Sequence, residues 1–185
     1  MSLRTRIGVM VPSTNTTFEA DFQLVAPRDF TIHGQRLWLT NDAATQKAYD
    51  ELVQKVCPCI IVVHSQGGNF GFNAALNAPD KVKALVAIEP SGAPDPAKAD
   101  AAKLKVVPHL IVWGDFHDKS ALWQRLRAGP EKWAEAIKTA GGSAEAFDLP
   151  KMGIKGNTHM LMMDKNSDDI AKLVHDWVGK QGLVN

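Results

Sequence analysis

Compact apolar runs alternate along the chain with longer stretches in which apolar residues recur every three or four positions. The compact runs predict strands, and they cover residues 6–11, 30–39, 59–63, 82–90, 106–115 and 143–150. The helical spacing predicts helices at 18–25, 41–56, 69–78 and 168–180, and one helix or two broken around Gly129–Pro130 within 120–142. Because strands and helices alternate throughout, we expect one α/β domain over residues 1–185, with a doubly wound, mostly parallel sheet.

Length and composition narrow the classes of function. A chain of 185 residues with 45% hydrophobic residues can bury one core of ordinary size. Lysine and arginine number 21 against 20 acidic residues, so a formal charge of +1 gives no overall attraction for nucleic acid or an anionic membrane. No apolar run approaches the roughly 20 residues of a membrane helix, and no segment resembles a secretory signal. We therefore expect a cytoplasmic protein whose partner is a small molecule.

The two cysteines, Cys57 and Cys59, lie in the segment VCPCII at the start of a predicted strand. A disulfide between residues two positions apart would close a strained loop, so we expect two small buried thiols instead. A metal site is not expected there, because no other cysteine, histidine or acidic residue follows at ligand spacing. Nothing else in the sequence indicates a cofactor.

The segment VVHSQGGN carries the clearest chemical signal. Ser65 follows an apolar strand and precedes Gly67 and Gly68 at the start of a predicted helix, which is the context of a nucleophile elbow. A serine on such a turn projects its hydroxyl beyond the carboxyl edge of the sheet, near the positive end of a helix dipole. The usual pattern has glycine two positions before the serine, and Val63 stands there instead. The alternative is a serine that only caps the helix.

A serine nucleophile needs a base, and His159 is the best placed histidine. It lies in the segment GIKGNTHM, a glycine-containing loop between the last predicted strand and the last predicted helix, as the order serine, acid, histidine requires. The alternative for His159 is a surface histidine with local hydrogen bonds. The others are less well placed: His33, His109 and His175 fall within predicted strands or a helix, and His64 and His117 lie near strand ends.

Two strand ends offer an acid to orient the imidazole. Glu89 ends the strand VKALVAIEP and Asp115 ends the strand LIVWGD, and spacing alone does not choose between them. Nearby tryptophans could line an apolar acyl pocket, although at this spacing they are more often in a core: Trp113, Trp123 and Trp133.

Residues 43–185 resemble the C-terminal half of bacterial α/β-hydrolase esterases. The resemblance is carried by the elbow in CIIVVHSQGGNFGF, by EPSG, by PHLIVWGD and by the GNTHM loop. In that family the glutamate of the EPSG segment is the acid of the triad. The resemblance therefore implies Ser65 as nucleophile, Glu89 as acid rather than Asp115, and His159 as base.

The first 42 residues resemble a different group, the maleate isomerases and arylmalonate decarboxylases of the Asp/Glu racemase superfamily. The segment RIGVMVPSTNTT carries this resemblance, which implies that the loop around Asn15 binds a substrate carboxylate. That group depends on cysteines at the carboxyl ends of later strands, whereas Cys57 and Cys59 lie at the entry to a strand. The chain thus resembles a chimera joined between Leu39 and Gln46, a truncated hydrolase whose expected strand order is 2-1-3-4-5-6.

The racemase-like residues 1–42 also affect the expected oxyanion hole. In α/β-hydrolases one donor is the amide after the nucleophile, here Gln66, and another comes from a loop that corresponds here to Ser13, Thr14 and Asn15. We expect a serine esterase for small carboxylic esters, with weak turnover if that loop is misplaced. Two alternatives stay open: an isomerase or decarboxylase of the racemase type, and a non-catalytic protein that binds a small carboxylate. An open sheet edge also makes a homodimer plausible.

Overall fold

The computed structural model describes residues 5–12, 30–37 and 42–184, the first two ranges through their backbone. Six strands form one sheet in the order β2-β1-β3-β4-β5-β6, and each neighbouring pair is parallel. The strands are β1 (Thr5–Pro12), β2 (Phe30–Leu37), β3 (Cys59–His64), β4 (Val82–Ile88), β5 (His109–Trp113) and β6 (Ala144–Asp148). This order confirms the expected doubly wound sheet. The helix expected at 18–25 lies outside the described residues.

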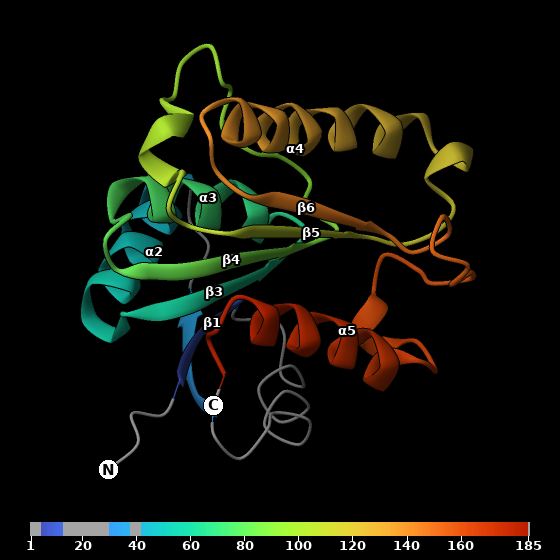
Figure 1. Cartoon of the computed structure of the whole chain (residues 1–185), viewed down its shortest axis with the longest axis horizontal. Helices are drawn as coiled ribbons and strands as arrows, with labels where there is room; N and C mark the ends of the chain where they lie inside the picture. Colours follow the sequence, from blue (N-terminus) through green and yellow to red (C-terminus); the bar gives the residue numbers. More distant parts are fainter. Residues whose placement is uncertain (1–4, 13–29, 38–41, 185) are drawn as a thin grey trace.

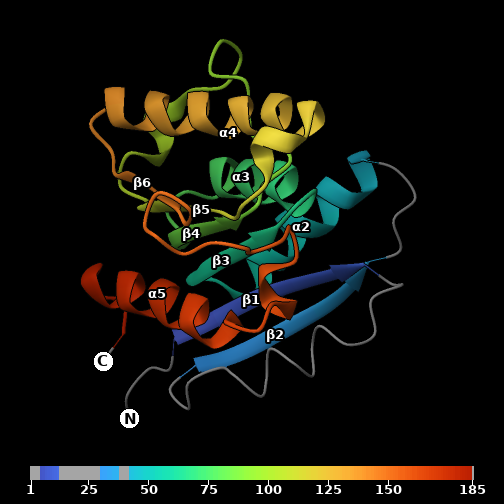
Figure 2. The same ribbon diagram turned by 90° about the vertical axis from the view of Figure 1, so that its right-hand side faces the viewer.

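Helices cover both faces of the sheet (Figures 1 and 2). They are α2 (Asp42–Val56), α3 (Gly67–Asn77), α4 (Ala121–Thr139) and α5 (Ser167–Lys180). In both views α2, α3 and α4 lie on one face and α5 lies on the other. The segment 120–142 forms a single helix, because α4 continues through Pro130, which is buried.

Two apolar cores lie on opposite sides of the central strands, as the alternation of side chains in a strand dictates. Along β3, Ile61 and Val63 join the core under α2, α3 and α4, whereas Ile60 joins the core under α5. Trp133 of α4 and Trp177 of α5 are almost fully buried in the two cores. The central strands are therefore apolar on both faces, which fixes their positions and holds their carboxyl ends at one edge.

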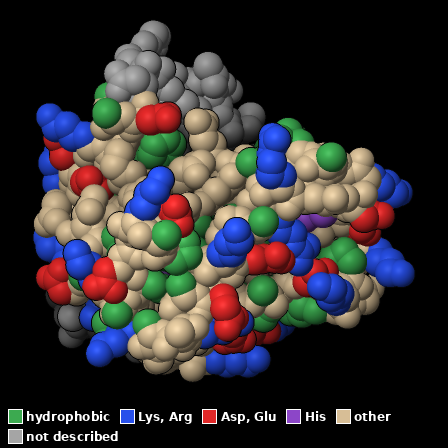
Figure 3. All heavy atoms as spheres, turned by 90° about the horizontal axis from the view of Figure 1, so that it is seen from above, with side chains coloured by type: hydrophobic (Ala, Val, Ile, Leu, Met, Phe, Trp, Pro, Cys, Tyr) green, Lys and Arg blue, Asp and Glu red, His purple; other side chains and the backbone are tan. Residues whose placement is uncertain are grey.

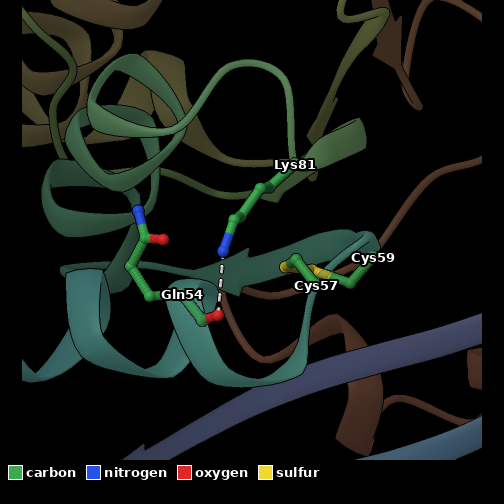
Figure 4. The surroundings of a disulfide bond; sticks show 4 residues. All are labelled: Gln54, Cys57, Cys59 and Lys81. Atoms are coloured by element: carbon green, nitrogen blue, oxygen red, sulfur yellow. Dashed lines mark hydrogen bonds between the residues drawn. A yellow bond between two sulfur atoms is a disulfide. The ribbon is translucent and has the colours of Figure 1, made fainter.

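The expectation of two free thiols was wrong, because Cys57 and Cys59 form a disulfide between the end of α2 and the start of β3 (Figure 4). Their Cα atoms lie 4.3 Å apart, which is close to the lower end of the distances that a disulfide spans. The peptide bond between Cys57 and Pro58 is cis. Beside the disulfide, Lys81 Nζ donates a 3.0 Å hydrogen bond to the carbonyl oxygen of Gln54.

The face of the molecule that carries α4 displays lysine and arginine side chains interspersed with aspartate and glutamate (Figure 3). Charges of one sign do not gather on this face, in agreement with the formal net charge of +1. In the described part of the chain, no helix combines the length and apolarity that crossing a bilayer requires.

Candidate active site

Ser65 lies on a tight turn between β3 and α3, with a φ angle of +54°. This left-handed conformation costs a residue with a side chain about 1–3 kcal/mol, so it persists only where the surroundings enforce it. Three backbone hydrogen bonds of 3.0 Å do so here: Ser65 N–H donates to Ile88 O, and Ser65 O accepts from Gly68 and Ser91. The turn thus holds the serine hydroxyl beyond the carboxyl edge of the sheet.

Close packing explains both the glycines of the elbow and the valine that replaces one. A Cβ on Gly68 would lie 2.7 Å from Pro90 Cβ, so the helix can approach the end of β4 only through glycine. A Cβ on Gly71 would lie 2.7 Å from Val63 Cγ1. Val63 is therefore accommodated because the facing position of α3 has no side chain.

His159 connects Ser65 to Glu89. Its Nε2 lies 2.9 Å from Ser65 Oγ, and its Nδ1 lies 3.2 Å from Glu89 Oε2. The three residues come from the ends of β3 and β4 and from the loop after β6, and we call them the Ser–His–Glu cluster. With its Nδ1–H donated to the carboxylate, the imidazole presents an acceptor at Nε2 to the serine hydroxyl.

The Glu89 carboxylate is only 1% exposed and is surrounded by donors. Its Oε1 accepts from the Gly114 amide, and its Oε2 accepts from His159 Nδ1 and from His117 Nε2. Burial by itself raises the pKa of Glu89, but the hydrogen bonds from His159, Gly114 and His117 outweigh it, so the pKa is lowered overall. The carboxylate therefore stays ionised in a nearly dry position.

A second network positions the loop that carries His159. The buried Asn157 side chain donates to Asp164 Oδ2 at 3.1 Å and to Asn166 Oδ1 at 2.7 Å. Asp164 also accepts from the amide and the hydroxyl of Thr158, at 2.8 and 3.0 Å. Because Thr158 directly precedes His159, these bonds fix the backbone from which the imidazole projects.

The alternative acid, Asp115, does not face His159. Its carboxylate accepts from the amides of Phe116 and Gly156, at 2.8 and 2.9 Å. These two hydrogen bonds, the one from Gly156 first, lower the pKa of Asp115. Asp115 therefore ties the residues after β5 to the loop that carries His159.

Two histidines that their sequence positions rank no higher than His159 also contact the cluster. The His64 ring lies 4.6 Å from the His159 ring, and its Nε2 donates to the His159 carbonyl oxygen at 2.8 Å. Burial lowers the pKa of His64. His117 Nε2 lies 2.9 Å from Glu89 Oε2. Their positions directly after β3 and shortly after β5 were the available signal, since the carboxyl ends of these strands meet at one edge.

The tryptophans divide between core and site. Trp113 and Trp133 are fully buried in the core, so they do not line an acyl pocket. Trp123 is half-buried at the start of α4, and its ring lies 4.3 Å from the His159 ring. Of the three, only Trp123 contacts the cluster directly.

Gln66 directly follows Ser65 and precedes the first residue of α3, so its amide lies at the positive end of that helix. The other expected oxyanion residues, Ser13, Thr14 and Asn15, lie outside the described residues. Within the residues that are described, no three histidine, cysteine or acidic side chains gather closely enough to hold a metal ion.

Comparison with known proteins agrees with this architecture. The alpha/beta hydrolase fold family matches residues 57–144. The chain is 31% identical to a bacterial esterase of known structure, with a TM-score of 0.65, over 75% of this chain and 42% of the esterase. The chain has the α/β-hydrolase fold. The expected fold class is thereby confirmed.

Two further relatives extend the comparison. A probable secreted lipase from Fungal sp. (strain ATCC 74256) is 26% identical over 76% of this chain and 51% of its own length. Est1E from Butyrivibrio proteoclasticus is 16% identical, with a TM-score of 0.61 over 97% of this chain and 89% of Est1E, and it supports the fold alone. The chain spans about half the length of the fungal lipase and less than half of the bacterial esterase.

Proposed function

We propose that this protein is a serine hydrolase that cleaves small carboxylic esters with Ser65 as nucleophile, His159 as base and Glu89 as acid. The observation that carries the proposal is the imidazole of His159, which lies within hydrogen-bond distance of both the serine hydroxyl and a buried carboxylate. The matches to a bacterial esterase and a probable lipase support the same reaction class.

The reaction proceeds in two halves. Ser65 Oγ attacks the ester carbonyl carbon while its proton passes to His159 Nε2, and the carbonyl oxygen becomes an oxyanion. Collapse of this intermediate breaks the bond to the alcohol, which leaves with the proton from His159. Water then attacks the acyl-serine, again with His159 as base, and releases the acid. Glu89 stabilises the imidazolium in both halves.

The rate depends on the oxyanion hole. The Gln66 amide is the first proposed donor, and the amides of Ser13 and Thr14 or the side chain of Asn15 are the second. Loss of one donor costs about 3–4 kcal/mol in the transition state, which lowers kcat by two to three orders of magnitude. We therefore expect turnover to be measurable but slow if the second donor is misplaced.

The proposal also covers the two-part make-up of the chain, its oligomeric state and its cellular location. Residues 1–42 form a racemase-like segment that replaces two strands of a hydrolase, and residues 43–185 form the hydrolase part of one domain. What supports this division is the resemblance that the segment RIGVMVPSTNTT carries. A second copy of the chain would cover the open edge of the sheet and form a homodimer. A cytoplasmic location stays a prediction.

The proposal is tested by reacting the folded protein with a fluorophosphonate and locating the added mass by peptide mass spectrometry. We expect label on Ser65, no label in Ser65→Ala, and full label in Ser143→Ala, which removes an exposed serine from the α4–β6 turn. Hydrolysis of p-nitrophenyl acetate, followed at 400 nm, should depend on the same residue.

Two results would overturn the assignment. Absence of label on a correctly folded protein would favour a non-catalytic carboxylate-binding protein. Turnover of a dicarboxylate that survives Ser65→Ala would favour the isomerase or decarboxylase alternative.

A further inference from the structure

The imidazole of His117 shares an oxygen atom with the proposed base. Both His117 Nε2, at 2.9 Å, and His159 Nδ1, at 3.2 Å, face Glu89 Oε2. The other carboxylate oxygen accepts from the Gly114 amide. Glu89 is thus held by three N–H groups, and the distance to His117 is shorter than the distance to the base itself.

Neighbouring groups determine which nitrogen of His117 carries the proton. A guanidinium nitrogen of Arg127 lies 3.5 Å from His117 Nδ1, and a guanidinium has only donors. A proton on Nε2 suits both neighbours, because the Glu89 carboxylate only accepts hydrogen bonds and the guanidinium only donates them. Arg127 is itself held by Asp148 at 2.7 Å and Glu131 at 2.6 Å. Burial lowers the pKa of Arg127, but these hydrogen bonds raise it overall, so the side chain remains a cation.

Aromatic packing fixes the plane of the ring. The His117 ring stacks on Trp123 at 5.8 Å with an interplanar angle of 14°, and meets Trp113 edge-on at 5.4 Å and 81°. Trp123 also contacts the His159 ring. Two aromatic contacts therefore hold the ring in the orientation in which Nε2 faces the carboxylate.

We propose that His117 is a positioning residue of the active site, which donates a second imidazole N–H to Glu89 and so limits how strongly Glu89 holds the proton on His159. This inference rests on the proposed function. Among the described residues, the titratable groups that face His117 are Glu89 at the end of β4, Arg127 on α4 and, across the carboxylate, His159. Asp118 and Lys119 of its own short helix are exposed.

The consequence follows from charge sharing. A donor on Oε2 takes up part of the negative charge that would otherwise stabilise the imidazolium of His159. With less charge on Oε2, Glu89 stabilises the imidazolium of His159 less strongly. Removal of the His117 donor should strengthen the hydrogen bond from His159 to Glu89. The activity should then begin to fall at a higher pH when the solution is acidified.

Two substitutions separate hydrogen bonding from packing. His117→Phe keeps a ring in contact with the tryptophans but has no donor, whereas the amide nitrogen of His117→Gln can replace Nε2. For His117→Phe we expect the acid limb of the kcat/KM profile for p-nitrophenyl acetate to move up by about 0.5–1 pH unit, with KM unchanged. For His117→Gln the limb should stay at the wild-type position. His175→Phe, on the outer part of α5, is the matched control.

Nuclear magnetic resonance tests the inference without turnover. In His117→Phe the Nδ1 proton of His159 should move downfield, because its bond to Glu89 no longer competes with a second donor, and in His117→Gln it should not move. In the wild-type protein, long-range ¹⁵N–¹H spectra should show the His117 proton on Nε2.

The outcomes are distinct. An unchanged acid limb and an unchanged Nδ1 proton in His117→Phe would overturn the positioning role, as would a wild-type His117 proton on Nδ1 alone. A His117→Gln variant that behaves like His117→Phe would also overturn it. If the wild-type protein shows no turnover that depends on Ser65, the proposed esterase function fails, and the resonance measurements alone decide whether His117 controls the His159–Glu89 bond.

Discussion

Glu89 carries its charge in a nearly dry position because three N–H groups surround the carboxylate. Asp115, the other strand-end acid, is also hydrogen-bonded, but to amides of the loop rather than to an imidazole. Sequence spacing could not separate the two acids. The direction of each side chain at its strand end separates them, and backbone conformation sets this direction: Glu89 has a φ angle of +48°.

Replacing Glu89 by glutamine should reduce activity far more than replacing Asp115 by asparagine. Glu89→Gln has a similar shape but no charge to stabilise the imidazolium or select its tautomer, so kcat for p-nitrophenyl acetate should fall about a thousandfold to ten-thousandfold. Asp115→Asn should lower kcat only severalfold, by loosening the loop. Steady-state kinetics of both purified variants provides the measurement.

The opposite ranking would identify Asp115 as the working acid. Equal, small losses would mean that the reaction does not depend on a carboxylate behind His159. Circular dichroism of both variants ensures that a loss of activity reflects the site and not unfolding.

The packing of β3 against α3 depends on one pair of positions. Val63 fills the space that a side chain at Gly71 would need, so Gly71→Ala must displace the strand or the helix. We expect Gly71→Ala to lower the free energy of unfolding by about 1–3 kcal/mol, as for overpacking elsewhere. In a Val63→Ala background the same change should cost less, because the clashing methyl groups are gone.

Urea denaturation of the two single variants and the double variant gives the coupling between these positions. If the costs were additive, the valine and the glycine would be independent, and the explanation of the altered elbow would be wrong.

The loop that carries His159 is held in place by the buried side-chain amide of Asn157. Asn157→Ala removes the donor to Asp164 and Asn166 and leaves their acceptors without it, at a cost of about 1–3 kcal/mol. A displaced loop misplaces the imidazole, so kcat should fall about 10–100-fold while KM changes little. Asn77→Ala, at the exposed end of α3, is the matched control and should leave both quantities close to wild type.

Unfolding curves measure the loss of stability in Asn157→Ala, and steady-state kinetics measures the loss of kcat. A loss of stability with unchanged kcat would mean that His159 does not need this network for its position.

Over the whole chain, the alternation of strands and helices was enough to predict the parallel sheet and, together with the resemblance, its strand order. It also brought Ser65, Glu89 and His159 to one edge, because the carboxyl ends of parallel strands meet there. Which of the two cores a strand residue joins follows from the period of two along the strand.

Other contacts could not be predicted from the sequence, because they depend on the conformation of turns and not on the spacing of apolar residues. The bond from His117 to Glu89 depends on the turn after β5, where Phe116 has a φ angle of +68°. The Cys57–Cys59 disulfide joins residues only two positions apart, a pairing that sequence spacing argues against. Roles assigned to Ser13, Thr14 and Asn15 stay predictions, because these residues lie outside the described part of the chain.

Acid stability of the whole molecule should depend on a histidine far from the chemistry. His109 is buried in β5, where its Nδ1–H donates to Val107 O at 2.7 Å and its ring stacks on Phe72. Its Nε2 has no hydrogen-bond partner among the described residues. Burial lowers its pKa from 6.5 to about 4. Between these values the unfolded chain binds a proton that the folded protein does not, so the free energy of unfolding falls as the pH falls.

The size of the effect follows from the shift. Between pH 7.5 and 5.0, His109 should contribute a loss of about 2 kcal/mol in the free energy of unfolding. The lowered pKa of His64 acts in the same direction, whereas the lowered pKa of Glu89 matters only at lower pH, as that carboxylate protonates. Urea denaturation at the two pH values should therefore show a smaller loss for His109→Phe than for wild type, and an unchanged loss for His175→Phe. If His109→Phe loses as much stability as wild type, His109 is already protonated in the folded protein or its neutral form is not what the core requires.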